Sequence, residues 1–159
     1  MRRKDSLKNA ALVIIDMQNL FWNPQGNLYK RGYKLLNKKF TQNLLKKANL
    51  QWEEDFIGEL KILEDGSAYV IEKKTYDIFF KTNIDELLIK NKIKKIIFTG
   101  ILTNVCVESS MRSSFLRGYS PVLLSDCTTT YSNFLKRSTI INIKRHFGHI
   151  QTIQEYIEG

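Results

Sequence analysis

The stretch Ile96-Ile-Phe-Thr-Gly-Ile-Leu-Thr-Asn-Val-Cys-Val107 decides the fold class of this 159-residue chain. It begins with an apolar, β-branched run that is typical of a buried strand and that ends at Gly100. A tight turn follows, and Thr103 is placed to cap a helix that begins near Asn104. This order predicts a strand, a turn and a helix, with Cys106 in the first turn of that helix.

Cys106 is the first candidate for a functional residue. The positive end of a helix dipole favours an anion, and helix N-termini lower the pKa of a thiol from about 8.5 towards neutrality or below. A structural cysteine gains nothing from this location, whereas a nucleophile gains its thiolate form. We therefore expect a depressed pKa for Cys106 and a role as nucleophile. Cys127 follows no comparable helix start and is assigned to the core.

The rest of the chain alternates between strand and helix patterns. Such alternation predicts an α/β fold in which helices cover a mostly parallel sheet. Gly118 and Gly148 are well placed to end two of the helices. The expected strands cover residues 11–15, 68–72, 95–99, 122–125 and 150–153, and the expected helices cover residues 35–50, 84–90, 104–117 and 133–147.

Charged or nucleophilic groups follow four of the expected strands. They are Asp16, Lys73, the turn that leads to Cys106, and Asp126. Ligands of parallel sheets bind outside the carboxyl ends of the strands. We therefore expect these groups to converge on one edge of the sheet, where they form a candidate site.

A thiol, a carboxylate and an ammonium group together suit acyl transfer. Cys106 would attack an electrophilic carbon, and Asp16 would take the thiol proton, pass it to the leaving nitrogen and later activate water. Lys73 would hold the carboxylate in place, although Lys74 beside it is an alternative at this stage. The backbone amides of Leu102 and Cys106 would receive the developing oxyanion.

Composition predicts a single globular domain over residues 1–159. The chain is 43% hydrophobic and 26% charged, which excludes a disordered protein. No apolar stretch is long enough to cross a membrane, and the first residues lack the apolar segment of a signal peptide. Two cysteines make no disulfide framework, so we expect a cytoplasmic protein without a membrane partner.

The net charge of +9 raises the question of a nucleic-acid partner. Much of the excess lies in residues 30–47 and 90–95, where lysine alternates with asparagine. We favour a solvated surface over nucleic-acid binding, because charge runs of this kind mislead easily. The positive field is still suited to attract an anionic substrate.

Four blocks of the sequence occur in the order typical of one superfamily. The chain resembles the isochorismatase-like cysteine hydrolases, which include nicotinamidases and N-carbamoyl amidohydrolases. The resemblance covers roughly residues 9–30 and 66–157. The blocks are Ala11-Leu-Val-Ile-Ile-Asp-Met-Gln-Asn-Leu-Phe21, Tyr69-Val-Ile-Glu-Lys-Lys-Thr-Tyr-Asp-Ile-Phe-Phe-Lys-Thr82, Thr99-Gly-Ile-Leu-Thr-Asn-Val-Cys-Val-Glu-Ser109, and Arg117-Gly-Tyr with Ser125-Asp126.

The resemblance implies a Rossmann-like three-layer α/β/α fold and a catalytic triad of Asp16, Lys73 and Cys106. It favours Lys73 over Lys74, because Lys73 stands nine residues before Thr82, as the catalytic lysine does in the family motif. Members of the family usually form dimers or larger oligomers, so a homo-oligomer is expected.

The resemblance also implies a cis peptide bond that does not involve proline. It would lie between Ile101 and Leu102 and would turn backbone amides towards the oxyanion. Ile101, Leu102 and Cys106 are therefore the expected oxyanion site.

The chain departs from the family in the segment between the Asp and Lys blocks. Nicotinamidases bind a metal there through an aspartate and two histidines, whereas residues 17–72 contain no histidine. His146 and His149 are separated by Gly148 and lack a third ligand, so we expect no metal and no cofactor. The segment is also short, so we expect either that residues 52–60 replace the usual second strand in another form or that the sheet is smaller by one strand.

The leading hypothesis is a metal-independent amidase that acts on a small amide, ureido or carbamoyl compound. An isochorismatase-type vinyl-ether hydrolase is an alternative, but such enzymes often lack the cysteine. A binding module without catalysis is another alternative, and the intact triad argues against it. The candidate substrate contacts are Phe21, Trp22, Tyr76 and Thr103, with Tyr29 as a further aromatic residue.

Overall fold

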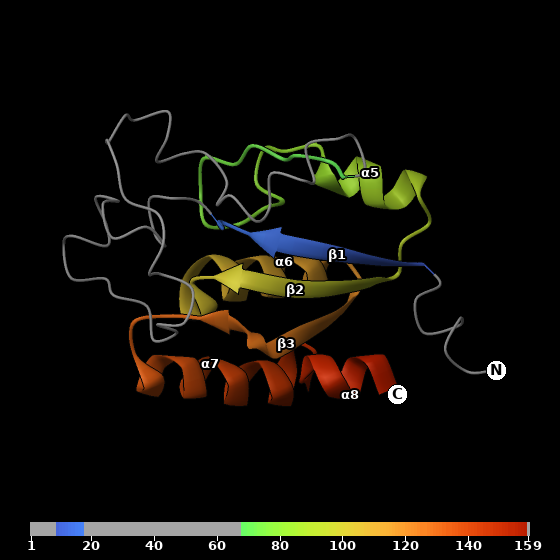
Figure 1. Ribbon diagram of the computed structural model, residues 1–159. Helices are drawn as coiled ribbons and strands as arrows, with labels where there is room; N and C mark the ends of the chain where they lie inside the picture. Colours follow the sequence, from blue (N-terminus) through green and yellow to red (C-terminus); the bar gives the residue numbers. More distant parts are fainter. Residues whose placement is uncertain (1–8, 18–67, 159) are drawn as a thin grey trace, which may run out of the picture.

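The computed structural model describes residues 9–17 and 68–158 of the chain, and these residues form an open parallel sheet with helices around it (Figure 1). The elements in chain order are β1 (Ala10–Ile15), α5 (Ile84–Lys90), β2 (Lys95–Ile101), the π-helix η3 (Thr103–Val107), α6 (Glu108–Leu116), β3 (Ser120–Thr129), α7 (Asn133–His146), β4 (His149–Gln151) and α8 (Ile153–Glu158).

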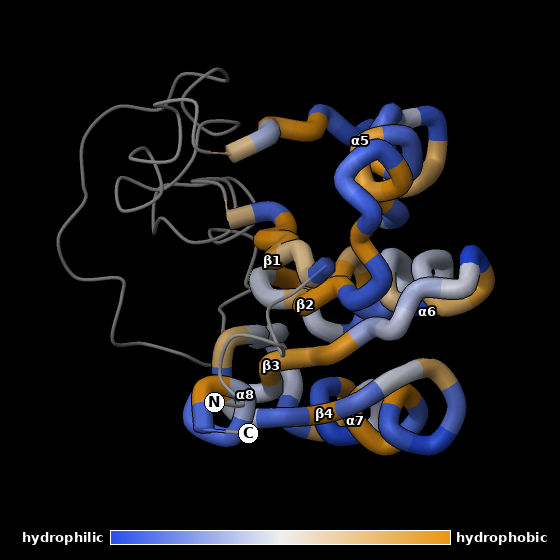
Figure 2. The backbone as a smooth tube through the Cα atoms, turned by 90° about the vertical axis from the view of Figure 1, so that its right-hand side faces the viewer, coloured by the Kyte–Doolittle hydropathy of each residue, from blue (hydrophilic) through white to orange (hydrophobic). Residues whose placement is uncertain are grey.

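The four described strands pair in the order β1-β2-β3-β4, and each pair is parallel. The arrowheads of β1, β2 and β3 therefore point to the same edge of the sheet in Figure 1. In Figure 2, which looks along the strands, α5, α6 and α7 lie on one side of the sheet and α8 lies on the other. The predicted α/β fold with a parallel sheet is confirmed.

The core lies between β2 and the helices that cover it. Ile96 and Phe98 of β2 are fully buried and belong to one cluster with Met111 of α6, Leu123 of β3 and Ile143 of α7. The tube of Figure 2 is accordingly hydrophobic along much of β1, β2 and β3. Burial of these side chains stabilises each of them by about 1.5–3 kcal/mol relative to an exposed position.

The register between β2 and β3 is irregular, and this changes the expected end of β3. Phe98 pairs with Leu123, but Gly100 pairs with Thr128, so two steps along β2 face five along β3. The strand expected to end at residue 125 therefore continues to Thr129. Irregularities of this kind re-aim side chains near sheet edges.

The irregularity corrects the expectation for Asp126. This residue lies inside β3 and is exposed, and its Oδ1 accepts a hydrogen bond from the backbone N–H of Ile153 at 2.9 Å. The carboxylate thus contacts the start of α8 and does not join the other charged groups predicted at the sheet edge.

Three further expectations differ from the structure. Residues 68–72 form no strand, since no described strand pairs with them. The last strand ends at Gln151, and α8 occupies Ile153–Glu158. Cys106 does not lie in an α-helix that begins near Asn104: it lies in the π-helix η3, and α6 begins only at Glu108.

No helix among the described residues is both long and apolar enough to cross a membrane.

Gly100 is the residue that lets β1 and β2 approach each other at the functional edge. It pairs with Ile15 and has a φ of +102°, a conformation that glycine adopts at little cost. A Cβ atom at this position would lie 2.1 Å from the carbonyl oxygen of Ile15. Gly118, which ends α6 as predicted, also has a positive φ of +85°, but a Cβ there would meet no atom within 4 Å.

This comparison predicts that Gly100→Ala destabilises the protein much more than Gly118→Ala. The second substitution costs about 1–2 kcal/mol for the left-handed conformation alone. The first adds a clash with backbone and is expected to cost roughly 3 kcal/mol or more. Urea unfolding of both variants measures the difference, and equal losses would show that the contact with Ile15 yields without cost.

Candidate active site

Asp16 and Lys73 form an ion pair at the carboxyl end of β1. Asp16 follows β1 directly, and its Oδ2 accepts a hydrogen bond from the Nζ of Lys73 at 2.7 Å. The two side chains are only 12% and 13% exposed, respectively. Lys73 also donates to the carbonyl oxygen of Thr75 at 3.0 Å. Lys74, the alternative to Lys73, is exposed.

Cys106 reaches the same place from β2. It lies in η3, which begins two residues after the end of β2, and it is 5% exposed. Its thiol lies close to the carboxylate of Asp16 and the ammonium group of Lys73, whose charges shift its pKa in opposite directions, and close to the backbone of Leu102. The fold therefore brings together a thiol, a carboxylate and an ammonium group from three segments.

The predicted depression of the Cys106 pKa is wrong. The pKa of the thiol is raised from 9.0 to about 12, chiefly by burial and then by the neighbouring carboxylate of Asp16. Lys73 and the backbone of Leu102 lower the pKa, but they only partly offset these effects. The thiol is therefore neutral in the resting site, and it needs a proton acceptor before it can react.

The turn before Cys106 has an unusual backbone. The peptide bond between Ile101 and Leu102 is cis, at the position that the family resemblance implies. Leu102, rather than Thr103, is the N-cap residue of η3, and its carbonyl oxygen accepts hydrogen bonds from the N–H groups of Val105 and Val107. The prediction that the Thr103 side chain caps the helix is therefore wrong.

Threonines at the end of β3 and directly after it hold this turn in place. The hydroxyl of Thr128 donates to the carbonyl oxygen of Gly100 at 2.8 Å and lies 2.9 Å from the hydroxyl of Thr103. Thr130 donates to Oδ1 of Asn104 at 2.6 Å. Thr103 is fully buried by these contacts, which give it a structural role, and direct contact with a substrate remains a prediction.

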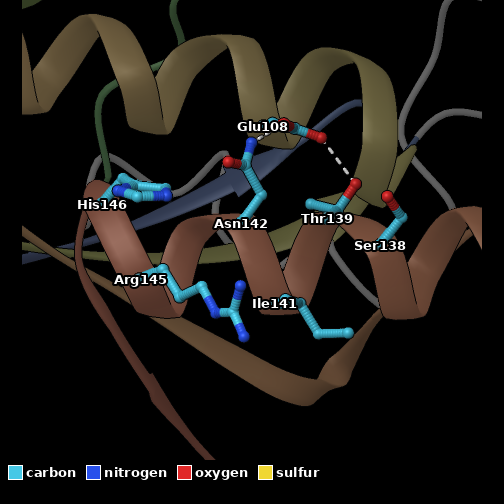
Figure 3. Close-up of a pocket in the computed structure, with 7 residues that line it drawn as sticks. All are labelled: Glu108, Ser138, Thr139, Ile141, Asn142, Arg145 and His146. Atoms are coloured by element: carbon cyan, nitrogen blue, oxygen red, sulfur yellow. Dashed lines mark hydrogen bonds between the residues drawn. The ribbon is translucent and has the colours of Figure 1, made fainter.

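Glu108 directly follows η3, the helix that carries Cys106, and holds its end in place. The sequence did not single out this residue. Its carboxylate accepts hydrogen bonds from Arg112 at 2.6 Å, from Thr139 at 2.5 Å and from Asn142 at 3.2 Å. Figure 3 shows Glu108 of α6 beside Thr139 and Asn142 of α7. The spacing of Glu108 and Arg112 by four residues is the one signal that would have indicated part of this network.

A pocket of about 320 Å³ lies beside Glu108 and is otherwise lined by residues of α7 (Figure 3). Asp16, Lys73 and Cys106 do not line it, so we do not assign it to the candidate active site.

The remaining predicted site residues have different outcomes. Tyr76 is 64% exposed. Phe21, Trp22 and Tyr29 lie outside the described residues. Within the described part of the chain, no group of three His, Cys, Asp or Glu side chains is placed to hold a metal ion. Independence from metals stays a prediction.

Comparison with known proteins identifies the family. The sequence-family model described as the isochorismatase domain matches residues 34–155. The chain belongs to the isochorismatase family. The match includes Lys73 and Cys106, whereas Asp16 lies before its first residue.

Relatives and solved structures agree with this assignment. A ureidoacrylate amidohydrolase RutB of an Enterobacter species is 37% identical over 109 residues, which are 68% of this chain and 46% of the relative. Nicotinamidase 3 of Arabidopsis thaliana is 26% identical and is matched over 94% of this chain and 87% of its own. An isochorismatase-like hydrolase from Alkaliphilus metalliredigens has the same fold, with a TM-score of 0.74, 24% identity and 94% coverage of both chains.

The chain spans less than half the length of these ureidoacrylate amidohydrolases, between 42% and 46%. The family assignment therefore rests on the part of these relatives that the chain matches.

The electrostatics of the site predict opposite effects for its two charged residues. Asp16→Asn removes the charge that raises the pKa of Cys106, so the thiolate fraction at a fixed alkaline pH should increase. Lys73→Met removes the charge that lowers this pKa, so the thiolate fraction should decrease. In each variant, the rate at which iodoacetamide alkylates Cys106 should change by roughly tenfold for each unit by which the pKa of the thiol shifts.

The measurement uses a Cys127→Ser background, which leaves Cys106 as the single thiol. Slower alkylation of the Asp16→Asn variant would contradict the assigned direction, provided that circular dichroism shows the variant to be folded.

Proposed function

We propose that this isochorismatase-family chain is a cysteine hydrolase that cleaves a C–N bond in a small amide, ureido or carbamoyl compound without a metal. The observation that carries the proposal is the position of Asp16 beside both other groups: it accepts from Lys73 at 2.7 Å, and it lies close enough to Cys106 to raise the pKa of the thiol. A carboxylate in that position is able to accept the thiol proton, and a thiol with a raised pKa requires such an acceptor.

In the first half of the reaction, the sulfur of Cys106 attacks the carbonyl carbon of the substrate while its proton moves to Asp16. A C–S bond forms, and the carbonyl oxygen gains the negative charge of the tetrahedral intermediate. Asp16 then gives the proton to the leaving nitrogen, the C–N bond breaks, and an amine or ammonia departs. The enzyme is left as a thioester at Cys106.

In the second half, Asp16 takes a proton from water, and the resulting hydroxide attacks the thioester. The C–S bond breaks, the thiolate regains the proton from Asp16, and a carboxylic or carbamic acid is released. Lys73 keeps the carboxylate in position and partly neutralises its charge throughout. The backbone at Ile101, Leu102 and Cys106 is the proposed oxyanion site.

The substrate class is supported by two kinds of relatives. The names ureidoacrylate amidohydrolase and nicotinamidase both describe hydrolysis of a C–N bond next to a carbonyl group. The lack of histidine in residues 17–72 supports a reaction without the metal site of nicotinamidases. A small-molecule substrate and a homo-oligomeric state complete the proposal.

The proposal predicts that Cys106→Ala abolishes hydrolysis and that Cys127→Ala does not. Without the sulfur no thioester forms, so turnover should fall by a factor of at least about 10³. Ammonia release from a panel of small amides and ureido acids identifies a substrate and measures both variants. Asp16→Asn is expected to slow the acylation step, because the proton acceptor is lost.

The thioester provides a direct test. Mass spectrometry of the protein quenched during turnover should show the acyl group on the peptide that contains Cys106. Full turnover by a folded Cys106→Ala variant, on a substrate of the parent protein, would exclude the covalent mechanism.

A further inference from the structure

The segment that carries Lys73 has no regular secondary structure, yet its backbone is held at a defined place. Residues 73–77 contain neither strand nor helix. Lys73 must nevertheless keep its Nζ at 2.7 Å from Asp16. Loop positions of this kind are precise only where neighbouring elements supply hydrogen bonds.

Ser110 of α6 supplies two of these hydrogen bonds. Its side chain is fully buried. The hydroxyl accepts from the backbone N–H of Ile78 at 3.1 Å and donates to the carbonyl oxygen of Tyr76 at 3.3 Å. One side chain thus satisfies two backbone groups of the loop that follows Lys73, and its removal would leave both without this partner.

Ser113, one turn further along α6, makes a third contact with the same loop. It donates to Oδ2 of Asp77 at 2.7 Å, while Oδ1 of Asp77 accepts from the backbone N–H of Phe79 at 2.9 Å. Arg117 donates to the Ser113 hydroxyl at 2.5 Å, which orients it. The loop is therefore attached to α6 at two successive turns.

The contacts continue from Asp77 to the ammonium group. The hydroxyl of Thr75 accepts from the backbone N–H of Asp77 and donates to its carbonyl oxygen, both at 3.3 Å. The carbonyl oxygen of Thr75 accepts from the Nζ of Lys73 at 3.0 Å. Cys106 lies only four residues before Ser110, and η3 runs directly into α6. The same helical segment therefore carries the thiol and anchors the loop that follows Lys73.

We propose that Ser110, with Ser113 as its helper, is a positioning residue that holds the Lys73 loop on α6 and so fixes the ammonium group relative to Asp16 and Cys106. Neither serine touches the reacting atoms. The inference rests on the proposed function for its catalytic meaning, but its test uses only the reactivity of the Cys106 thiol.

The test is a double-mutant cycle in the Cys127→Ser protein. The alkylation rate of Cys106 by iodoacetamide is measured at one alkaline pH with and without Lys73→Met, in the parent and in Ser110→Ala. In the parent, loss of Lys73 should slow alkylation by roughly tenfold for each unit by which the pKa rises. In Ser110→Ala the ammonium group is no longer held, so the same loss should slow it by only about threefold or less.

Ser114→Ala is the matched control. Ser114 is also a fully buried serine of α6, but its hydroxyl donates to the carbonyl oxygen of Met111 within the helix. The effect of Lys73→Met should therefore be the same in this background as in the parent. A general loss of stability would affect both serine variants, whereas loss of positioning affects only Ser110→Ala.

The outcomes are separable from those of the proposed function. An equal effect of Lys73→Met in the parent and in folded Ser110→Ala would overturn the positioning role. If Ser110→Ala does not fold by circular dichroism, Ser113→Ala decides in the same way, since its hydroxyl is only partly buried. A protein that shows the coupling but hydrolyses no amide would retain the positioning role and lose the proposed activity.

Discussion

The close approach of β1 and β2 at Gly100 is the constraint on which the rest of the site depends. The backbone of Ile15 occupies the space where any other residue at position 100 would place its Cβ, only 2.1 Å from a carbonyl oxygen. Asp16 is the next residue after this contact, and the turn to Cys106 leaves β2 immediately beyond it. Strand pairing therefore brings the acid and the thiol together before any side chain contributes.

Burial at this edge disfavours charge on all three groups of the site. Asp16 and Lys73, with side chains only 12% and 13% exposed, lose hydration in this site, and their ion pair at 2.7 Å works against that loss. The same burial disfavours the thiolate of Cys106, which is further disfavoured by the neighbouring carboxylate. Burying charged groups in this way contributes little to stability, and a buried thiol with a strongly shifted pKa is typical of functional sites.

The helix that carries Cys106 is held from both sides. Glu108 connects its first turn to α7 through Thr139 and Asn142. Ser110 and Ser113 connect the same helix to the loop that follows Lys73. Small hydroxyl side chains suit this task, because they satisfy backbone groups at short range and lose little conformational entropy on burial.

Most of the strands and helices could be predicted because their signals are local. The apolar run before Gly100, the glycine after α6 and the periodic pattern of α7 each depend on neighbours in the chain. The expected strand at 68–72 failed for the opposite reason. Its residues suit a strand, but no described strand offers them backbone partners.

The sequence by itself determined the α/β class and the residue types that stand after β1 and β2, since both follow from short-range patterns and from motif spacing. Only the tertiary structure decided that Asp126 turns to α8, that the pKa of Cys106 is raised instead of lowered, and that Ser110 reaches the Lys73 loop. These outcomes depend on burial and on contacts between residues far apart in the chain, 27 and 32 positions for the two hydrogen bonds, which no local pattern contains.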